Sequence, residues 1–253
     1  MLLVSDIHAA FGALRRVTAS GETVLILGDL VNLTDYRTGD GLIADTFGDD
    51  FARETSDARG RGDFGGMRQL WEDMSQGDWD AVRATLGVGL RAQYEECRRA
   101  LEGGRGYIIH GNVDHPALLQ EHLPDDWVFA DGLTFEIEGM RIGFAGGGVP
   151  GPFGGLGDDD EMRHRLEGLG EVEILCTHIP PAVDPLQRDT ITGRLERGSI
   201  PVLEFLETRR PRLHFFGDVH QPQATVWRVG DTLCRNLGYF RATGRPLRLT
   251  QGA

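Results

Sequence analysis

Side chains of the kinds that bind divalent metal ions follow five short apolar stretches of this chain. The candidate ligands are Asp6, His8, Asp29, Asn112, His178, Asp218 and His220. Carboxylates, amide oxygens and imidazoles are the oxygen and nitrogen ligands that such ions take from proteins. These candidates are more than one ion needs. The pattern therefore predicts a site for two ions that share one carboxylate.

The five apolar stretches are predicted to be buried β-strands that bring these side chains together. They span residues 2–4, 23–27, 107–109, 172–176 and 213–216. Short continuous apolar runs suit strands that are covered on both faces, and ligands bind at the C-terminal ends of strands in α/β sheets. Within Asp6-Ile7-His8 and Asp218-Val219-His220, the alternation of an extended segment points the first and third side chains the same way.

The rest of the chain predicts helices between the strands and one long insertion. Apolar spacing indicates helices at 11–19, 161–169 and 200–209 and from about 67 to 101, and hairpins around 138–139 and 230–231. Residues 35–66 are rich in Gly, Asp and Arg and poor in aliphatic residues, which predicts a long loop or a partly mobile flap. We therefore expect a single domain, residues 1–253, in which about 35–101 form a loop plus a helical insertion or cap.

Composition and charge exclude several classes of protein. The 253 residues are 40% hydrophobic, which suffices for a core and argues against disorder. With 26 basic and 39 acidic residues the net charge is −13, so coating of a nucleic acid polymer or an anionic membrane is disfavoured. An odd number of cysteines, without a CxxC pair, fits a reducing cytoplasm. No apolar run approaches membrane-spanning length, so we expect a cytoplasmic protein without a membrane partner.

The ordered motifs DIH, GDL, GNVD, TH and GDVH, each after an apolar stretch, resemble those of the calcineurin-like metallophosphoesterase superfamily. That family carries D-x-H, G-D, G-N, H and G-H-x-H, and the resemblance extends from Asp6 to His220. It implies a four-layer α/β/β/α sandwich around a dinuclear metal centre. Asp29 would bridge the two ions. The implied ligands of the first ion are Asp6, His8 and His220, and those of the second are Asn112 and His178.

Two positions depart from the family pattern. Val113 stands where many members have a histidine that protonates the leaving group, and His115 is the candidate substitute. Asp114, beside it, is expected to orient a histidine or the turn. Asp218 occupies the place of the first histidine of G-H-x-H, where a carboxylate could also bind the second ion or could act only as an orienting group.

The resemblance implies metal-assisted hydrolysis of phosphoesters, and we predict small phosphodiesters as substrates. Mn²⁺ is the first candidate for the two ions, with Fe, Zn, Ni and Mg as alternatives. A phosphomonoesterase, a nucleotide pyrophosphatase and a non-catalytic metal-binding scaffold remain alternatives of the same fold. The oligomeric state is left open.

Each motif also has an ordinary structural interpretation. Asp6 and His8 could cap a helix and form a turn, Asp29 and Asn112 could simply end strands, and His178 could cap the rigid turn before two prolines. Five motifs in order favour the metal site. For two further histidines, His110 at the end of a strand stretch and His214 within one, we expect roles in the core or in support of the ligands rather than metal binding.

Overall fold

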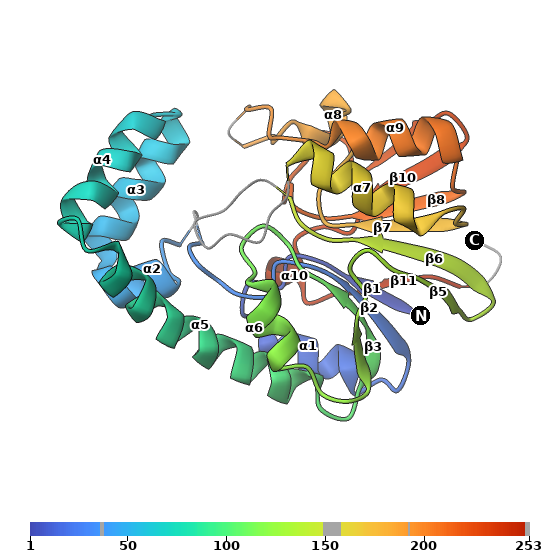
Figure 1. Ribbon diagram of the computed structural model, residues 1–253, viewed down its shortest axis with the longest axis horizontal. Coiled ribbons are helices and arrows are strands. Elements are labelled where there is room, and N and C mark those ends of the chain that lie inside the picture. Colours follow the sequence, from blue (N-terminus) through green and yellow to red (C-terminus); the bar gives the residue numbers. More distant parts are fainter. Residues whose placement is uncertain (36–37, 149–157, 192, 251–253) are drawn as a thin grey trace. The chain divides into compact units, whose positions relative to one another are not determined.

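The computed structural model describes residues 1–35, 38–148, 158–191 and 193–250. The chain divides into two compact units (Figure 1). The first comprises Met1–Leu30 and Cys97–Ala253, and the second comprises Val31–Glu96. All the candidate metal ligands belong to the first unit.

The first unit contains two β-sheets. The five-stranded sheet has the order β11-β1-β2-β3-β4, and the six-stranded sheet has the order β5-β6-β7-β8-β10-β9. The strands of the first sheet are β1 (Leu2–Val4), β2 (Thr23–Leu27), β3 (Arg105–Ile109), β4 (Trp127–Phe129) and β11 (Leu247–Arg248). Those of the second are β5 (Thr134–Ile137), β6 (Met140–Ala145), β7 (Ile174–Thr177), β8 (Leu213–Phe216), β9 (Val226–Val229) and β10 (Thr232–Asn236).

Parallel pairing aligns the ends of the strands that carry the candidate ligands. Strands β1 to β4 pair in parallel, as do β6, β7, β8 and β10, whereas β5, β9 and β11 pair antiparallel with their neighbours. The C-terminal ends of β1, β2 and β3 therefore lie at one edge of the first sheet. Those of β7 and β8 lie together at one edge of the second.

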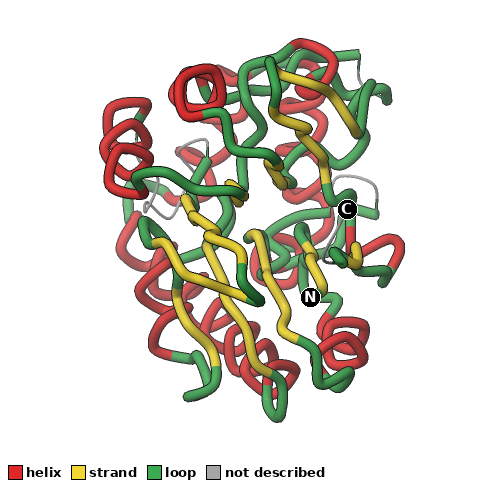
Figure 2. The backbone as a smooth tube through the Cα atoms, turned by 90° about the vertical axis from the view of Figure 1, so that its right-hand side faces the viewer, coloured by secondary structure: helices red, strands yellow, loops and turns green. Residues whose placement is uncertain are grey.

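The two sheets pack face to face, with helices on their outer sides (Figures 1 and 2). Leu25 and Leu27 of β2 share one buried cluster with Phe144, Cys176 and Phe215 of the other sheet. On the outer face of the six-stranded sheet a second cluster joins α7 (Asp159–Leu169) and α9 (Ile200–Arg209) to β7 and β8. The first unit also holds α1 (Phe11–Thr18), α6 (Pro116–Glu121), α8 (Asp184–Gln187) and α10 (Phe240–Thr243). This layering confirms the predicted α/β/β/α sandwich.

The second unit is helical, so the predicted loop at 35–66 is wrong over most of its described length. It contains α2 (Leu42–Phe47), α3 (Asp49–Arg61), α4 (Phe64–Ser75) and α5 (Trp79–Leu101), whose last turns belong to the first unit. Small residues form the buried face of α3, namely Ala52, Thr55 and Ala58. Acidic residues begin α3 and arginines end it, which favours a helix through the peptide dipole. A search for aliphatic spacing misses such a helix.

The single helical region expected from about 67 to 101 is two helices. Gln76 and Gly77 adopt positive φ between α4 and α5, and this conformation ends α4. Phe47, Phe51 and Trp71 pack edge to face within the second unit, with ring centroids 5.0 to 5.7 Å apart. Aromatic rings thus supply much of the apolar contact that aliphatic residues do not.

The predicted strands and hairpins agree with the structure to within a few residues, whereas β4, β11 and the shortest helices carry too little pattern to be predicted. Within the described ranges, no helix combines the length and apolarity needed to cross a membrane. The three cysteines are buried free thiols. The sequence is rich in glycine at 146–160, where a loop is expected, and residues 149–157 of this stretch lie outside the described residues.

Candidate metal centre

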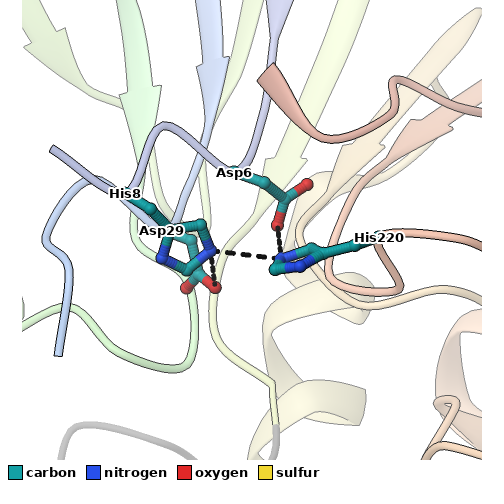
Figure 3. Close-up of side chains that lie close together, drawn as sticks. All are labelled: Asp6, His8, Asp29 and His220. Atoms are coloured by element: carbon teal, nitrogen blue, oxygen red, sulfur yellow. Dashed lines mark hydrogen bonds and ion pairs between the residues drawn. The ribbon is translucent and has the colours of Figure 1, made fainter. Parts of the chain in front are cut away.

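Four of the predicted ligands form a cluster at the strand ends (Figure 3). Asp6 and His8 follow β1, Asp29 follows β2, and His220 follows β8. Their potential ligand atoms all lie within 4.8 Å of one another. His8 Nε2 lies 3.2 Å from His220 Nε2 and 3.4 Å from Asp29 Oδ2, and His220 Nε2 lies 3.6 Å from Asp6 Oδ1. This is the residue set predicted for the first ion and the bridging carboxylate.

The other oxygen of Asp29 faces a second group. Asp29 Oδ1 lies 3.3 Å from His178 Nε2, and Asp218 Oδ1 lies 3.7 Å from the same nitrogen. Asn112 follows β3, and its neighbour Val113 donates its backbone N–H to Asp29 Oδ1 at 3.2 Å. Asp29 thus directs one oxygen at His8 and the other at His178, which is the arrangement that a bridging carboxylate requires.

Three of these side chains hold buried polar atoms without a hydrogen-bond partner among the described residues. They are Asp6 Oδ2, Asn112 Oδ1 and His178 Nε2. Burying a polar atom without a partner costs free energy, so native structures seldom tolerate it without an ion or water nearby. All three atoms are ligand types for divalent ions, so the donor set fits the predicted cations.

The tautomer of His178 suits metal binding. Its Nδ1 lies 2.7 Å from the backbone carbonyl oxygen of Leu27. A carbonyl oxygen only accepts, so Nδ1 carries a proton, and in its neutral form the ring presents a lone pair at Nε2. A hydrogen bond of this kind also fixes the ring of a ligating histidine. This contact links the end of β2 to the residue that follows β7.

The backbone is strained at the same positions. Asp6, His8, Asp29 and Asp218 all have positive φ, between 40° and 66°. L-residues with a side chain rarely adopt this conformation, which costs of order 1 kcal/mol or more per residue and persists where the surroundings impose it. The strain allows the turns to direct all four side chains into the centre.

Two glycines allow the turns after β2 and β3 to meet. A Cβ atom on Gly28 would lie 2.5 Å from the backbone nitrogen of Gly111 and 2.8 Å from His178 Nδ1. A Cβ atom on Gly111 would lie 2.6 Å from the backbone nitrogen of Asp29. Any larger residue at either position would push apart the groups that hold Asp29.

Asp114 binds the two turns together. Its Oδ2 accepts the backbone N–H groups of Asp29 and Gly111, each at 2.8 Å, and its Oδ1 accepts that of Leu30 at 2.9 Å. Burial raises the pKa of this carboxyl to about 6, and the charge of Asp29 adds to the rise. Of the two roles predicted for Asp114, the structure supports orientation of the turn.

His115 precedes α6 as its N-cap residue, with Nδ1 accepting the backbone N–H of Leu118 at 3.4 Å. This bond occupies one ring nitrogen as an acceptor. Proton donation to a leaving group would have to use the other nitrogen, and that role stays a prediction.

Asp218 points into the centre. Besides facing His178, it donates its backbone N–H to Asp6 Oδ1 at 3.1 Å. Burial raises the pKa of its carboxyl to about 7, in spite of the nearby imidazole of His178. The side chain thus lies beside His178, the other candidate ligand that faces Asp29 Oδ1.

Burial and the neighbouring charges shift the pKa values of the titrating groups of the centre in different directions. Burial disfavours the charged form of Asp29, but His178 and His8 outweigh it and hold the pKa of Asp29 well below its usual range. Burial lowers the pKa of His8, which favours the neutral, ligating form. Burial also opposes protonation of His178 and His220, yet neighbouring carboxylates raise both pKa values, Asp29 acting first on His178 and Asp6 on His220.

Residues near the C-terminus, which the sequence did not point to, hold the turns that carry Asp6, His8 and His220. The side-chain amide of Asn236 donates to the carbonyl oxygens of Gly217 and Val219, at 3.3 and 2.9 Å. The backbone N–H of Arg241 donates to the carbonyl oxygen of Asp6 at 3.1 Å, and its guanidinium donates to that of His8. Asn236 is the last residue of β10, which pairs in parallel with β8. A polar residue at the end of such a strand is the sequence feature that could have identified it.

Comparison with known proteins supports the fold. No protein-family model and no curated protein matches the sequence. The crystal structure of TT1561 from Thermus thermophilus superposes with a TM-score of 0.51 at 14% identity, over 95% of this chain and 89% of that one. A proposed 5′-nucleotidase from Staphylococcus aureus has a TM-score of 0.46 at 10% identity over 94% of this chain, which spans about half (48%) of its length.

Proposed function

We propose that the protein hydrolyses phosphoesters at a centre of two divalent metal ions and that its substrates are small phosphodiesters. The observation that carries the proposal is the position of Asp29. One of its carboxylate oxygens faces His8 and the other faces His178, and these two histidines belong to different groups of candidate ligands. Two ions bound there would lower the pKa of a water molecule and neutralise phosphoryl oxygens. Mn²⁺ is the first candidate because the donor set mixes carboxylate, amide and imidazole.

The chain's own residues define how such a site would work. Asp6, His8 and His220 would hold one ion, and Asn112, His178 and Asp218 the other, with Asp29 shared. The strained turns and the hydrogen bonds of Asp114 fix these groups before substrate arrives, so little reorganisation is needed. Val113 supplies no proton donor, so we propose that good leaving groups are favoured unless His115 fills this role.

Asp218 favours diesters by its charge. With Asp6, Asp29 and Asp218, three carboxylates face the four positive charges of two divalent ions, whereas a histidine at 218 would leave only two carboxylates. A phosphomonoester is mostly dianionic near pH 7 and a diester is monoanionic. The extra negative charge therefore weakens attraction for the monoester more, and low local dielectric enlarges the difference.

We further propose that the helical insertion at about 35–101 selects the substrate. The second unit begins at Val31, two residues after Asp29, and ends at Glu96. Segments inserted next to a site on a rigid scaffold commonly carry specificity. Replacement of 35–96 by a short linker should change the substrate profile more than the metal content, and the reverse result would contradict this role.

Metal analysis followed by a substrate panel tests the proposed function. The purified protein should bind two Mn²⁺ ions per chain and hydrolyse nitrophenyl phosphodiesters faster than the matched monoester. Faster hydrolysis of the monoester would favour a phosphomonoesterase, and cleavage confined to nucleotide pyrophosphate bonds would favour a pyrophosphatase. Two bound ions without hydrolysis of any ester would indicate a non-catalytic scaffold.

A further inference from the structure

The side chain of His220 is more exposed than those of five other candidate ligands. The side chain of His220 is 31% exposed, against 12% for Asp218 and 8% or less for Asp6, His8, Asp29 and His178. The surrounding protein therefore covers those five side chains more completely than it covers His220. The ring of His220 needs another restraint if it is to keep one orientation.

His220 also lacks the hydrogen bond that orients His178. A ligating histidine usually donates its second ring nitrogen to a carbonyl or carboxylate, as His178 does to Leu27. In the part of the chain that the structure describes, the hydrogen bonds and ion pairs of the His220 side chain all use Nε2. Its partners are His8 and Asp6, and they lie where the ion would bind. The opposite side of the ring is therefore held in some other way.

An aromatic ring lies flat against His220. The ring centroids of Tyr239 and His220 are 4.0 Å apart and their planes differ by 10°. The same tyrosine meets the ring of His8 edge to face, with centroids 5.7 Å apart at 68°. Tyr239 is 8% exposed, and the next two backbone N–H groups bond to the carbonyl oxygens of Ser5 and Asp6.

We propose that Tyr239 is a positioning residue that fixes the imidazole of His220 for the first metal ion. The stacked ring blocks rotation of the imidazole, so less conformational freedom is lost when the ion binds. The edge contact with His8 holds a second ligand of the same ion, whereas no ring contact joins Tyr239 to His178 among the described residues. The effect is therefore specific to the first ion. The inference rests on the proposed function only in requiring that a divalent ion binds there.

The experiment compares three tyrosine variants of the full chain. Tyr239→Phe keeps the stacked ring, and Tyr239→Leu removes it while keeping an apolar side chain. Tyr107→Leu is the matched control because Tyr107 stacks on Phe144, in the cluster between the sheets, with centroids 5.8 Å apart. Each chelator-treated protein is titrated with Mn²⁺ by calorimetry, and thermal unfolding of the metal-free protein confirms folding.

Tyr239→Leu should weaken binding of one of the two ions about 10-fold or more, a loss in the range seen for residues that orient ligands. The other ion should bind as in the wild type, and Tyr239→Phe and Tyr107→Leu should keep both affinities within about twofold. Unchanged affinities in Tyr239→Leu, equal weakening of both ions, or an equal loss in Tyr239→Phe would overturn the proposal. If Tyr239→Leu does not fold, Tyr239→Met replaces it, and the same changes in affinity support or overturn the proposal.

The titration separates this inference from the proposed function. A wild-type protein that binds a single ion refutes the two-metal chemistry. In that case a 10-fold loss in Tyr239→Leu still supports the role of Tyr239, and no loss overturns it. A wild-type protein that binds no ion overturns both. Two ions bound without hydrolysis would refute the hydrolytic function only.

Discussion

Asp114 holds Asp29 by its backbone, since Oδ2 of Asp114 accepts the N–H of Asp29 at 2.8 Å. The same carboxylate accepts N–H groups of Leu30 and Gly111, so one buried side chain fixes the turns that follow β2 and β3. These turns present Asp29, the proposed bridging carboxylate, and Asn112. The geometry of the centre thus depends on a residue that need not touch an ion.

Asp114→Asn should damage both stability and metal binding. The amide group replaces one acceptor oxygen by a donor, which leaves at least one buried N–H without an acceptor and costs about 1–3 kcal/mol of unfolding free energy. Misplaced turns should weaken Mn²⁺ binding about 10-fold or more. Urea unfolding and calorimetric titration measure the two effects. Asp184→Asn, which removes only an exposed ion pair with Arg188, is the control and should change neither.

Asp29→Asn should abolish most hydrolysis and reduce binding from two ions to one or none. The substitution keeps the shape of the side chain but removes the negative charge that both cations share, and an amide offers one ligand oxygen instead of two. Metal content and phosphodiester hydrolysis are measured on the same preparation, with Asp184→Asn as the control. Full activity in Asp29→Asn would exclude the bridging role.

Metal binding should stabilise the fold. Without cations the carboxylates of Asp6, Asp29 and Asp218 repel one another inside the protein, and ligand present at about 100 times its dissociation constant stabilises the folded state by about 2.7 kcal/mol. For a chain of this length, Mn²⁺ should raise the melting temperature by about 5 °C or more. Thermal unfolding with Mn²⁺ and with a chelator tests this, and Asp29→Asn should show a much smaller shift.

A buried histidine outside the centre makes stability depend on pH. The Nε2 of His214 lies 2.8 Å from the hydroxyl oxygen of Thr177, and burial lowers the pKa of His214 to about 3. The unfolded chain takes up a proton near pH 6.5, whereas the folded chain does not. The stability contributed by neutral His214 is therefore complete above about pH 6.5. It falls by about 1.4 kcal/mol for each unit as pH decreases toward 3.

His214→Gln removes this titration while keeping a donor for Thr177. Urea unfolding of the metal-free wild type and variant at pH 7, 6 and 5 should show a steeper loss of stability in the wild type. The metal ligands titrate in both proteins, so their contribution cancels in the difference. Parallel pH profiles would show that His214 is not kept neutral by the fold.

The strands could be predicted, and the candidate ligands chosen, because their signals are local. A run such as Thr23–Leu27 followed by Gly28-Asp29 carries its strand and its functional residue within a few positions. The helix α3 was missed because its buried face is built from alanine and threonine, and aliphatic spacing does not detect such residues.

The contacts of the supporting residues could not be predicted, although an orienting role for Asp114 was, because their partners are distant in sequence. Tyr239 stacks on a residue 19 positions away only because β8 and β10 are neighbours in the sheet. Asp114 reaches Asp29 across 85 positions because β2 and β3 pair. Both contacts follow from the strand order, which no local pattern specifies.

If the protein hydrolyses phosphoesters as proposed, Asp218→His should shift its preference toward phosphomonoesters. Asp218 Oδ1 faces His178 Nε2 at 3.7 Å, so its charge lies inside the centre. Replacing the carboxylate by a neutral imidazole would raise the net charge of the centre by one, and the more positive centre attracts a dianionic monoester more than a monoanionic diester. It would also favour Zn²⁺ over Mn²⁺ in the second position, since imidazole suits zinc better than carboxylate does.

We expect kcat/KM for nitrophenyl phosphate to rise about 10-fold relative to that for the matched diester, a change that corresponds to about 1.4 kcal/mol. Asp218→Asn serves as the control because it also removes the charge while keeping the size of the side chain, so it should shift the ratio in the same direction. An unchanged ratio in both variants would show that the charge of residue 218 does not select the substrate.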